Sequence, residues 1–250
     1  MKRGEKSLKL DLHLPDTGGR PFPVIICIPG GGWRDAMKNS VPLFLADHGF
    51  AVVGVEYRVS SEATAPANIQ DLKAAVDWVI RHAATYHLNP HRIGAYGASA
   101  GGHLAALLGV TTSVAELSDP KGAHQHPLRA VCDVCAPSDL NRIARSELQQ
   151  SFPALHEVTV GYLGGPVEAH KELARLVSPL TYVSRNCPPM LIIHGDKDDI
   201  VPLDESTIFH KALEYAGADT TLIVVKDGGH GWLVEETRDA VIAFFQKHLQ

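Results

Sequence analysis

Short apolar runs rich in β-branched residues alternate along this chain with longer segments of helical period. Val24–Ile28 and Ala51–Glu56 are almost continuously apolar, which is typical of strands covered on both faces. Apolar and polar residues alternate over Ser7–Leu14, as in an edge strand. The same reading predicts four further strands, at Arg92–Ala98, Ala130–Cys135, Met190–His194 and Thr220–Val225. Strands separated by helical segments predict an α/β fold with a mainly parallel sheet.

The helical segments have apolar residues at three- and four-residue spacing, which predicts one buried face on each. They are Asn68–Ala84, Ala100–Val110, a segment from Phe209 that stops at Gly217, and the closing Val234–Leu249. One long interval, 138–183, has no strong strand signal and carries short amphipathic pieces. An interval of this kind in a compact domain is usually functional, so we expect a lid or a substrate wall there. Without repeats or linkers, residues 1–250 are expected to form one domain.

Composition excludes several classes of function. The chain has 250 residues, with 23 Lys and Arg against 28 Asp and Glu, and no basic run interleaved with aromatics, so we expect no nucleic-acid partner. We also expect no membrane partner, because no apolar stretch approaches the ~18 residues of a span. The start of the sequence lacks the apolar region of a signal peptide, which predicts a cytoplasmic protein as written, or a secreted one if a native signal peptide is missing. The oligomeric state is left open.

The four cysteines, Cys27, Cys132, Cys135 and Cys187, have no spacing typical of a disulfide framework, so we expect free thiols. Cys132 and Cys135 form a C-x-x-C, but inside a predicted strand and without a second pair for zinc, which favours buried structural thiols. His124 and His126 have no further ligand at metal spacing. We expect no metal and no organic cofactor.

A candidate nucleophile stands between a predicted strand and a predicted helix. Residues 97–101 read Gly-Ala-Ser-Ala-Gly and match G-x-S-x-G around Ser99. A serine on a strained strand-to-helix turn projects its hydroxyl, and flanking glycines remove Cβ atoms that would clash. The helix N-terminus also favours developing negative charge. The alternative is an ordinary Gly/Ser turn.

A glycine run, Pro29-Gly-Gly-Gly-Trp33, directly follows the strand Val24–Ile28. Its backbone N–H groups, together with that of Ala100 after the nucleophile, are expected to form an oxyanion hole. Phosphate binding is the alternative, but the G-K-[ST] of a phosphate loop is absent.

The sequence offers 14 histidines as the base for Ser99. His230 is the best placed, because it lies in a glycine-rich loop just after the last strand and can reach over the carboxyl edge of the sheet. The others, including His103 in the helix after the nucleophile, are read as solvated or core histidines.

Three carboxylates, Asp196, Asp198 and Asp199, follow the strand Met190–His194 and precede His230, and Asp139 is an outside competitor. Any of the three would preserve the order Ser, Asp, His, and spacing alone does not choose among them.

Taken as a set, these motifs resemble the α/β-hydrolase superfamily, in particular compact esterases of the acetylxylan and feruloyl esterase type, related to the hormone-sensitive-lipase group and the prolyl oligopeptidase catalytic domain. The likeness runs from Ile26 to the C-terminus and includes Glu56-Tyr-Arg, residues 97–107 and residues 178–183. It implies a central sheet of about eight strands flanked by helices, with a small lid region.

The family pattern H-G-x-x-D-x-x-V-P, laid on residues 194–202, implies Asp198 as the acid. The resemblance also implies oxyanion donors at Gly31 and Gly32. Pro29 stands where the family often has a histidine that helps to hold the glycine loop, so the support of the loop must differ here.

These inferences predict a serine carboxylesterase with a catalytic triad of Ser99, Asp198 and His230, acting on short-chain acyl, carbohydrate or hydroxycinnamate esters. An arylformamidase or peptidase-type amide hydrolase is the alternative, followed by a non-catalytic binding protein with this fold. Trp33 and Trp232 flank the oxyanion loop and the base, and each is either a rim for the substrate or a packing residue.

Overall fold

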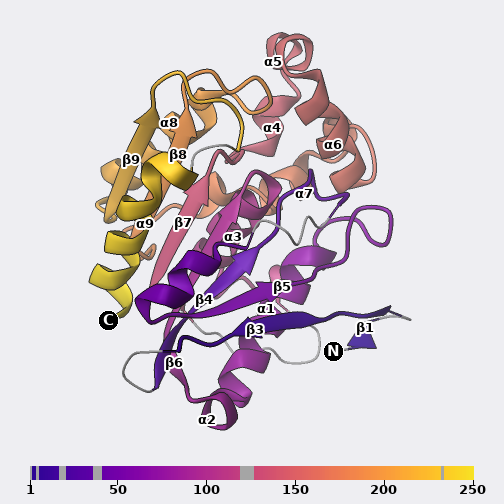
Figure 1. Ribbon diagram of the computed structural model, residues 1–250. Coiled ribbons are helices and arrows are strands. Elements are labelled where there is room, and N and C mark those ends of the chain that lie inside the picture. Colours follow the sequence, from indigo (N-terminus) through magenta and orange to yellow (C-terminus); the bar gives the residue numbers. More distant parts are fainter. Residues whose placement is uncertain (1, 4–5, 17–20, 36–40, 119–126, 232–233) are drawn as a thin grey trace.

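The computed structural model describes every residue except 1, 4–5, 17–20, 36–40, 119–126 and 232–233 (Figure 1). A seven-stranded sheet has the order β3-β5-β4-β6-β7-β8-β9, in which only β3 is antiparallel to its neighbour. Its strands are β3 (Leu10–His13), β4 (Phe22–Ile28), β5 (Ala51–Val55), β6 (Leu88–Ala98), β7 (Ala130–Val134), β8 (Met190–Gly195) and β9 (Thr220–Val225). The prediction of a mainly parallel sheet is confirmed, with seven strands in the described residues instead of about eight. The short strands β1 (Lys2–Arg3) and β2 (Lys6–Ser7) pair separately.

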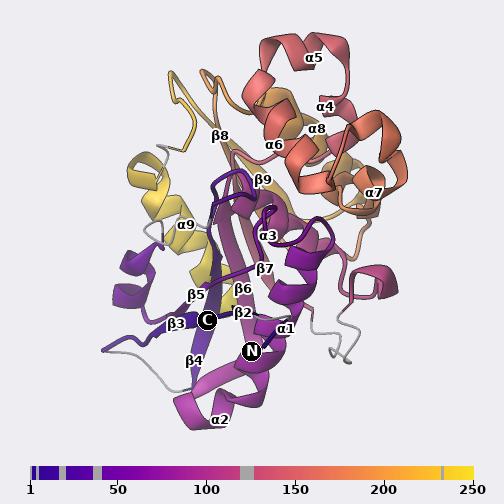
Figure 2. The same cartoon turned by 90° about the vertical axis from the view of Figure 1, so that its right-hand side faces the viewer.

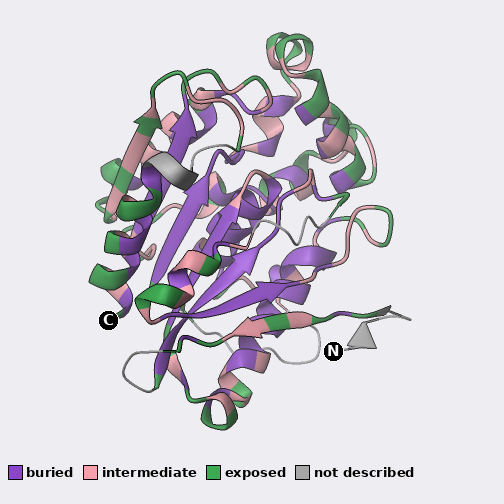
Figure 3. Cartoon of the chain, in the orientation of Figure 1, coloured by how far each residue is buried: buried purple, intermediate pink, exposed green. Residues whose placement is uncertain are grey.

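Helices cover both faces of the sheet (Figures 1 and 2). The alternation of side chains along β4 divides the core, since Val24 and Ile26 pack on one face and Ile25 and Cys27 on the other. The first face carries α1 (Ala67–Arg81), α3 (Ala100–Val110) and α8 (Leu203–Ala216), and the second carries η2 (Leu43–His48) and α9 (Val234–Leu249). β4, β5, β7 and β8 are buried throughout, as their apolar runs predict (Figure 3).

The predicted interval 138–183 is mostly helical and lies beyond the carboxyl ends of the strands (Figure 2). It contains α4 (Leu140–Ile143), α5 (Ser146–Ser151), α6 (Pro153–Leu163), η4 (Val167–Ala169), α7 (Lys171–Leu176) and η5 (Pro179–Tyr182). The remaining elements are α2 (Ala83–Tyr86) and η3 (Ala115–Leu117).

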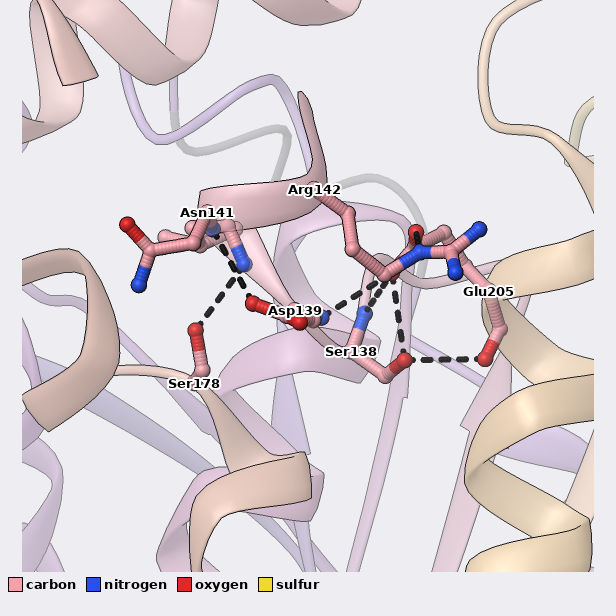
Figure 4. Close-up of polar contacts among 7 residues, drawn as sticks. Ser138, Asp139, Asn141, Arg142, Ser178 and Glu205 are labelled. Carbon is pink, nitrogen blue, oxygen red and sulfur yellow. Dashed lines mark hydrogen bonds and ion pairs between the residues drawn. The ribbon is translucent and has the colours of Figure 1, made fainter. Parts of the chain in front are cut away.

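Both ends of this interval are held at one point (Figure 4). Leu180 N–H donates to the Ser138 carbonyl at 3.1 Å, and Leu140 N–H donates to Ser178 Oγ at 2.9 Å. The buried carboxylate of Glu205, on α8, accepts hydrogen bonds from the backbone of Ser138 and Asp139, from Ser138 Oγ and from Arg142 Nε. The interval is therefore anchored to the helix that follows the 195–202 turn.

Candidate active site

Ser99 occupies a strained turn between β6 and α3. Its φ of 56° and ψ of −126° lie in a region that residues other than glycine rarely adopt. A Cβ on Gly97 would collide with the Gly101 carbonyl, and a Cβ on Gly101 with the Ile28 carbonyl. The glycines of the motif are thus required by close backbone approach, and the turn presents the Ser99 hydroxyl at the end of the helix.

His230 lies between Ser99 and Asp198. Its Nδ1 is 2.7 Å from Asp198 Oδ2 and its Nε2 is 2.9 Å from Ser99 Oγ. An ionised carboxylate only accepts hydrogen bonds, so Nδ1 carries the proton and Nε2 accepts from the Ser99 hydroxyl. The structure therefore brings together the serine, the histidine and the aspartate that the sequence singled out.

The Asp198 side chain is fully buried, accepts three hydrogen bonds and makes a fourth polar contact with His194. Its Oδ1 accepts from the N–H groups of Ile200, at 2.9 Å, and Val201, at 2.8 Å. Its Oδ2 accepts from His230 and lies 3.2 Å from His194 Nε2, whose proton is shared with the Val201 carbonyl at 2.9 Å. Burial opposes ionisation of this carboxyl, but the hydrogen bonds from His194, His230 and Val201 outweigh burial and hold its pKa well below the ordinary value.

The competing carboxylates have other positions. Asp196 and Asp199 are exposed, and Asp196 Oδ1 accepts from Asp227 N–H at 2.7 Å, which ties the turn after β8 to the loop of His230. Asp139 is the N-cap of α4, where its Oδ1 accepts from Asn141 N–H.

The oxyanion loop, residues 29–33, follows β4 at the same edge of the sheet. Gly31, Gly32 and Ala100 line a cleft of about 650 Å³ that also contains Ser99 and His230. Within the described residues, the backbone N–H groups of these three donate to no protein acceptor. They are therefore available to an anionic oxygen in the cleft.

Of the two tryptophans expected to be either rim or packing residues, the structure decides the case of Trp33. Trp33 borders the cleft but is only 1% exposed, so it packs in the core and offers no exposed rim for a sugar. Trp232 lies outside the described residues, and so do His124 and His126.

Cys135, Asp198 and His230 form one group of potential metal ligands among the described residues, with ligand atoms within 4.8 Å of one another. Burial raises the pKa of the Cys135 thiol to about 12, and a protonated thiol is a poor metal ligand. All four cysteines are free thiols, as expected, and Cys27, Cys132 and Cys135 are buried. We assign this group no metal.

Sequence reasoning missed the buried polar groups behind the site. His194 is 0% exposed and fixes Asp198, while its Nδ1 contacts Ser206 Oγ at 2.7 Å. Asp133, in the middle of β7, is 2% exposed, and its Oδ1 has no hydrogen-bond partner among the described residues. Burial raises the pKa of Asp133 to about 7, against the opposing effects of His194 and of the hydrogen bond from the Ala136 backbone. For Asp133, the only signal in the sequence was a carboxylate inside an otherwise apolar strand.

The Asp133→Asn variant is expected to gain stability relative to wild type as the pH rises, measured as the difference in their free energies of unfolding. The pKa of Asp133 is higher in the folded than in the unfolded chain. The stability that this carboxyl group gives the wild-type protein is therefore fully present below about pH 4 and is lost by about pH 7. Three pKa units set an upper limit of about 4 kcal/mol on the change. Urea unfolding of both proteins at pH 4.5, 6 and 8, with exposed Asp199→Asn as control, measures it. A stability difference that does not vary with pH would contradict this assignment.

An α/β-hydrolase fold that carries a Ser-His-Asp arrangement, beside loop amides with no acceptor among the described residues, defines the class of this protein as the α/β-hydrolases. The BD-FAE family model matches residues 10–213, and the chain belongs to the BD-FAE family.

Known proteins similar to this chain include esterases from several sources. Esterase LipC of Mycobacterium tuberculosis is 30% identical over 87% of this chain and 55% of its own length. A truncated carbohydrate esterase from gut microbiota is 32% identical, with a TM-score of 0.83 over 96% of this chain and 90% of that one. Butyrate-bound esterase 2 of Thermogutta terrifontis is 26% identical, with a TM-score of 0.80 over 99% of this chain and 91% of that one. The chain spans about half the length of the curated relatives it matches.

Proposed function

We propose that this protein hydrolyses carboxylic esters through a covalent acyl-enzyme. The observation that carries the proposal is the continuous contact from Ser99 Oγ to His230 Nε2, at 2.9 Å, and from His230 Nδ1 to Asp198 Oδ2, at 2.7 Å, beside three amides that have no acceptor in the described part of the chain. A hydroxyl needs a base within hydrogen-bond reach to become a nucleophile, and the base needs a fixed tautomer.

In the first half of the reaction, Ser99 Oγ attacks the ester carbonyl while His230 Nε2 takes the hydroxyl proton. The N–H groups of Gly31, Gly32 and Ala100 bind the oxygen that becomes negative. His230 then gives its proton to the leaving alcohol, and the acyl group remains on Ser99. In the second half, water loses a proton to His230 and attacks the acyl carbonyl. The bond between the acyl carbon and Ser99 Oγ then breaks, His230 returns the proton to Ser99 Oγ, and the acid is released. Asp198 holds the imidazole and stabilises its positive charge throughout.

The substrate class we propose is esters of short acyl chains, including acyl or hydroxycinnamoyl groups carried by carbohydrates. Leu155 and Val158 of α6, with Pro137, Ile200 and Val201, give the cleft an apolar wall. Similarity to a carbohydrate esterase and to an esterase that binds butyrate supports this class. We assign the α6 part of this wall to the interval 138–183, and we treat residues 1–250 as one catalytic domain because the proposed site draws on residues from Gly31 to His230. Within the described residues, no helix is both long and apolar enough to cross a membrane.

A substrate panel tests this proposal. Purified protein is given p-nitrophenyl acetate, butyrate and palmitate, methyl ferulate, acetylated xylan, p-nitroanilide amides of acetate and butyrate, and an aryl formamide. We expect kcat/KM to be highest for acetate or butyrate and at least tenfold lower for palmitate. The apolar side chains lie on one wall of the cleft, so they can contact only part of a long acyl chain. Preference for the formamide would favour the arylformamidase alternative. The absence of turnover and of Ser99 labelling by a fluorophosphonate would contradict the enzyme proposal itself.

A further inference from the structure

Three buried aromatic rings pack against one another, and one of them, Trp33, belongs to the oxyanion loop. Trp33 stacks on Tyr162 with ring centroids 4.6 Å apart and planes 19° apart, and it meets His103 edge-on at 5.1 Å. All three side chains are at most 1% exposed. They come from the loop after β4, from α6 of the interval 138–183 and from α3, in which His103 lies one turn beyond Ser99. The loop is thus packed against both the helix of the nucleophile and the wall of the cleft.

The hydrogen bonds of His103 have one possible direction. Trp33 Nε1–H can only donate, so His103 Nδ1, at 3.2 Å, accepts from it. His103 Nε2 then carries the proton and donates to the Val177 carbonyl at 2.7 Å. Burial lowers the pKa of His103 to about 4, although the bond to Val177 favours the charged form, so the imidazole is neutral at neutral pH. Both ring nitrogens are therefore used.

The loop needs such restraint because of its backbone. Gly31, Gly32 and Trp33 have φ values of 105°, 59° and 57°, three consecutive residues in the left-handed region. For Trp33, which has a Cβ, this conformation costs about 1–3 kcal/mol and persists only where the surroundings fix it. Ser60 donates from N–H and Oγ to the Trp33 carbonyl, and Tyr57 Oη–H donates to the Pro29 carbonyl at 2.9 Å.

These contacts show how the loop is held with a proline, Pro29, as its first residue. Proline has no side-chain donor, and Tyr57 supplies one from outside at its carbonyl. At the other end of the glycine run, the side chain of Trp33 itself reaches into the core and is fixed by His103. The two ends of the loop are thus held from different elements, and the amides of Gly31 and Gly32 lie between them.

We propose that His103 and Trp33 are positioning residues for the oxyanion hole, whose indole–imidazole hydrogen bond fixes the loop conformation that leaves the Gly31 and Gly32 amides free to face the cleft. This inference rests on the proposed ester hydrolysis. Because His103 also holds Val177, the same ring fixes the oxyanion loop relative to the interval that forms the cleft wall.

The sharpest test removes the indole proton alone. Site-specific replacement of Trp33 by its benzothienyl analogue keeps the shape and the stacking on Tyr162 but has sulfur in place of N–H. Two pairs of variants accompany it. Trp33→Phe is matched by Trp78→Phe, since Trp78 of α1 stacks on His82, the residue after that helix, and does not line the cleft. His103→Leu removes the acceptor, whereas His103→Asn places an amide oxygen near the position of Nδ1.

Each protein is measured for thermal midpoint, for kcat and KM with p-nitrophenyl acetate, and for the Ki of an aryl trifluoromethyl ketone, which adds to the nucleophile and carries an oxyanion. For the benzothienyl protein, Trp33→Phe and His103→Leu, we expect kcat to fall about 10- to 100-fold with KM within about twofold of wild type. The Ki should rise by a similar factor. His103→Asn should recover most of the loss, and Trp78→Phe should behave as wild type.

A benzothienyl protein with kcat and Ki within twofold of wild type would overturn the inference, and so would a loss that appears in KM alone. Because the analogue preserves packing, instability of His103→Leu does not remove the test. Failure of the proposed function gives a different result, namely a wild-type protein without ester turnover and without fluorophosphonate labelling.

Discussion

Ser99→Ala is expected to lower kcat for p-nitrophenyl acetate by about 10³- to 10⁶-fold while the protein stays folded. The substitution removes the oxygen that forms the acyl-enzyme and leaves the oxyanion amides and the cleft in place. What remains is the rate that binding and the oxyanion hole give to direct attack by water. KM should change little, because the lost oxygen makes its bond in the transition state and not in the initial complex.

The backbone of Ser99 supplies a second variant that separates loss of chemistry from loss of fold. With φ at 56° and ψ at −126°, Ser99 sits where glycine is favoured, so Ser99→Gly should remove activity and raise the thermal midpoint. Stopped-flow and steady-state assays, thermal melts and fluorophosphonate labelling are compared for wild type, both variants and Ser61→Ala, an exposed serine in the loop after β5. Full activity in Ser99→Ala would mean that another group is the nucleophile.

The parts of this structure that could be predicted from the sequence are those set by local pattern. The strands follow apolar runs of five to seven residues, because a strand buried on both faces admits few polar side chains. Ser99 and the oxyanion loop were found through glycines, since close backbone approach at the strand ends excludes a Cβ. Parallel strands bring their carboxyl ends to one edge, which also placed His230 near Ser99.

The choice of Asp198 came from a family pattern, and the contacts of its side chain support that choice. Only a carboxylate that turns inward can accept from Ile200, Val201, His194 and His230 together, and this depends on the course of the turn after β8. Sequence spacing does not encode that course, so Asp196 and Asp199 were equal candidates.

Trp33 and His103 show where local pattern ends. Whether a tryptophan after a glycine run faces the cleft or the core depends on the sign of φ at residues 31–33, which contacts with Ser60, His103 and Tyr162 select. Those partners are distant in sequence. The number and position of the helices between 138 and 183 were equally beyond reach, since short amphipathic pieces do not specify what they pack against.

Asp198→Asn is expected to lower kcat by about 10³- to 10⁴-fold with a small effect on KM. The amide oxygen can keep the hydrogen bonds from Ile200 and Val201, so the turn is retained. The amide N–H₂ then faces His230 Nδ1, which donates to Asp198 Oδ2 in the wild type, and His194 Nε2, which lies 3.2 Å from that oxygen. To accept from the amide, His230 must move its proton to Nε2, and in that tautomer it cannot take a proton from Ser99.

Asp196→Asn and Asp199→Asn are matched controls, because they make the same change within two residues of Asp198. Asp199 is exposed, and Asp196 needs only a carbonyl-type oxygen to accept from Asp227 N–H, which asparagine retains. Both should keep kcat within about threefold of wild type. Equal losses in all three variants would show a general effect of charge near the cleft. A larger loss in Asp199→Asn than in Asp198→Asn would show that the assignment of the acid to Asp198 is wrong. A loss confined to Asp198→Asn identifies Asp198 as the carboxylate that sets the His230 tautomer, because all three variants remove one negative charge from nearly the same place in the sequence.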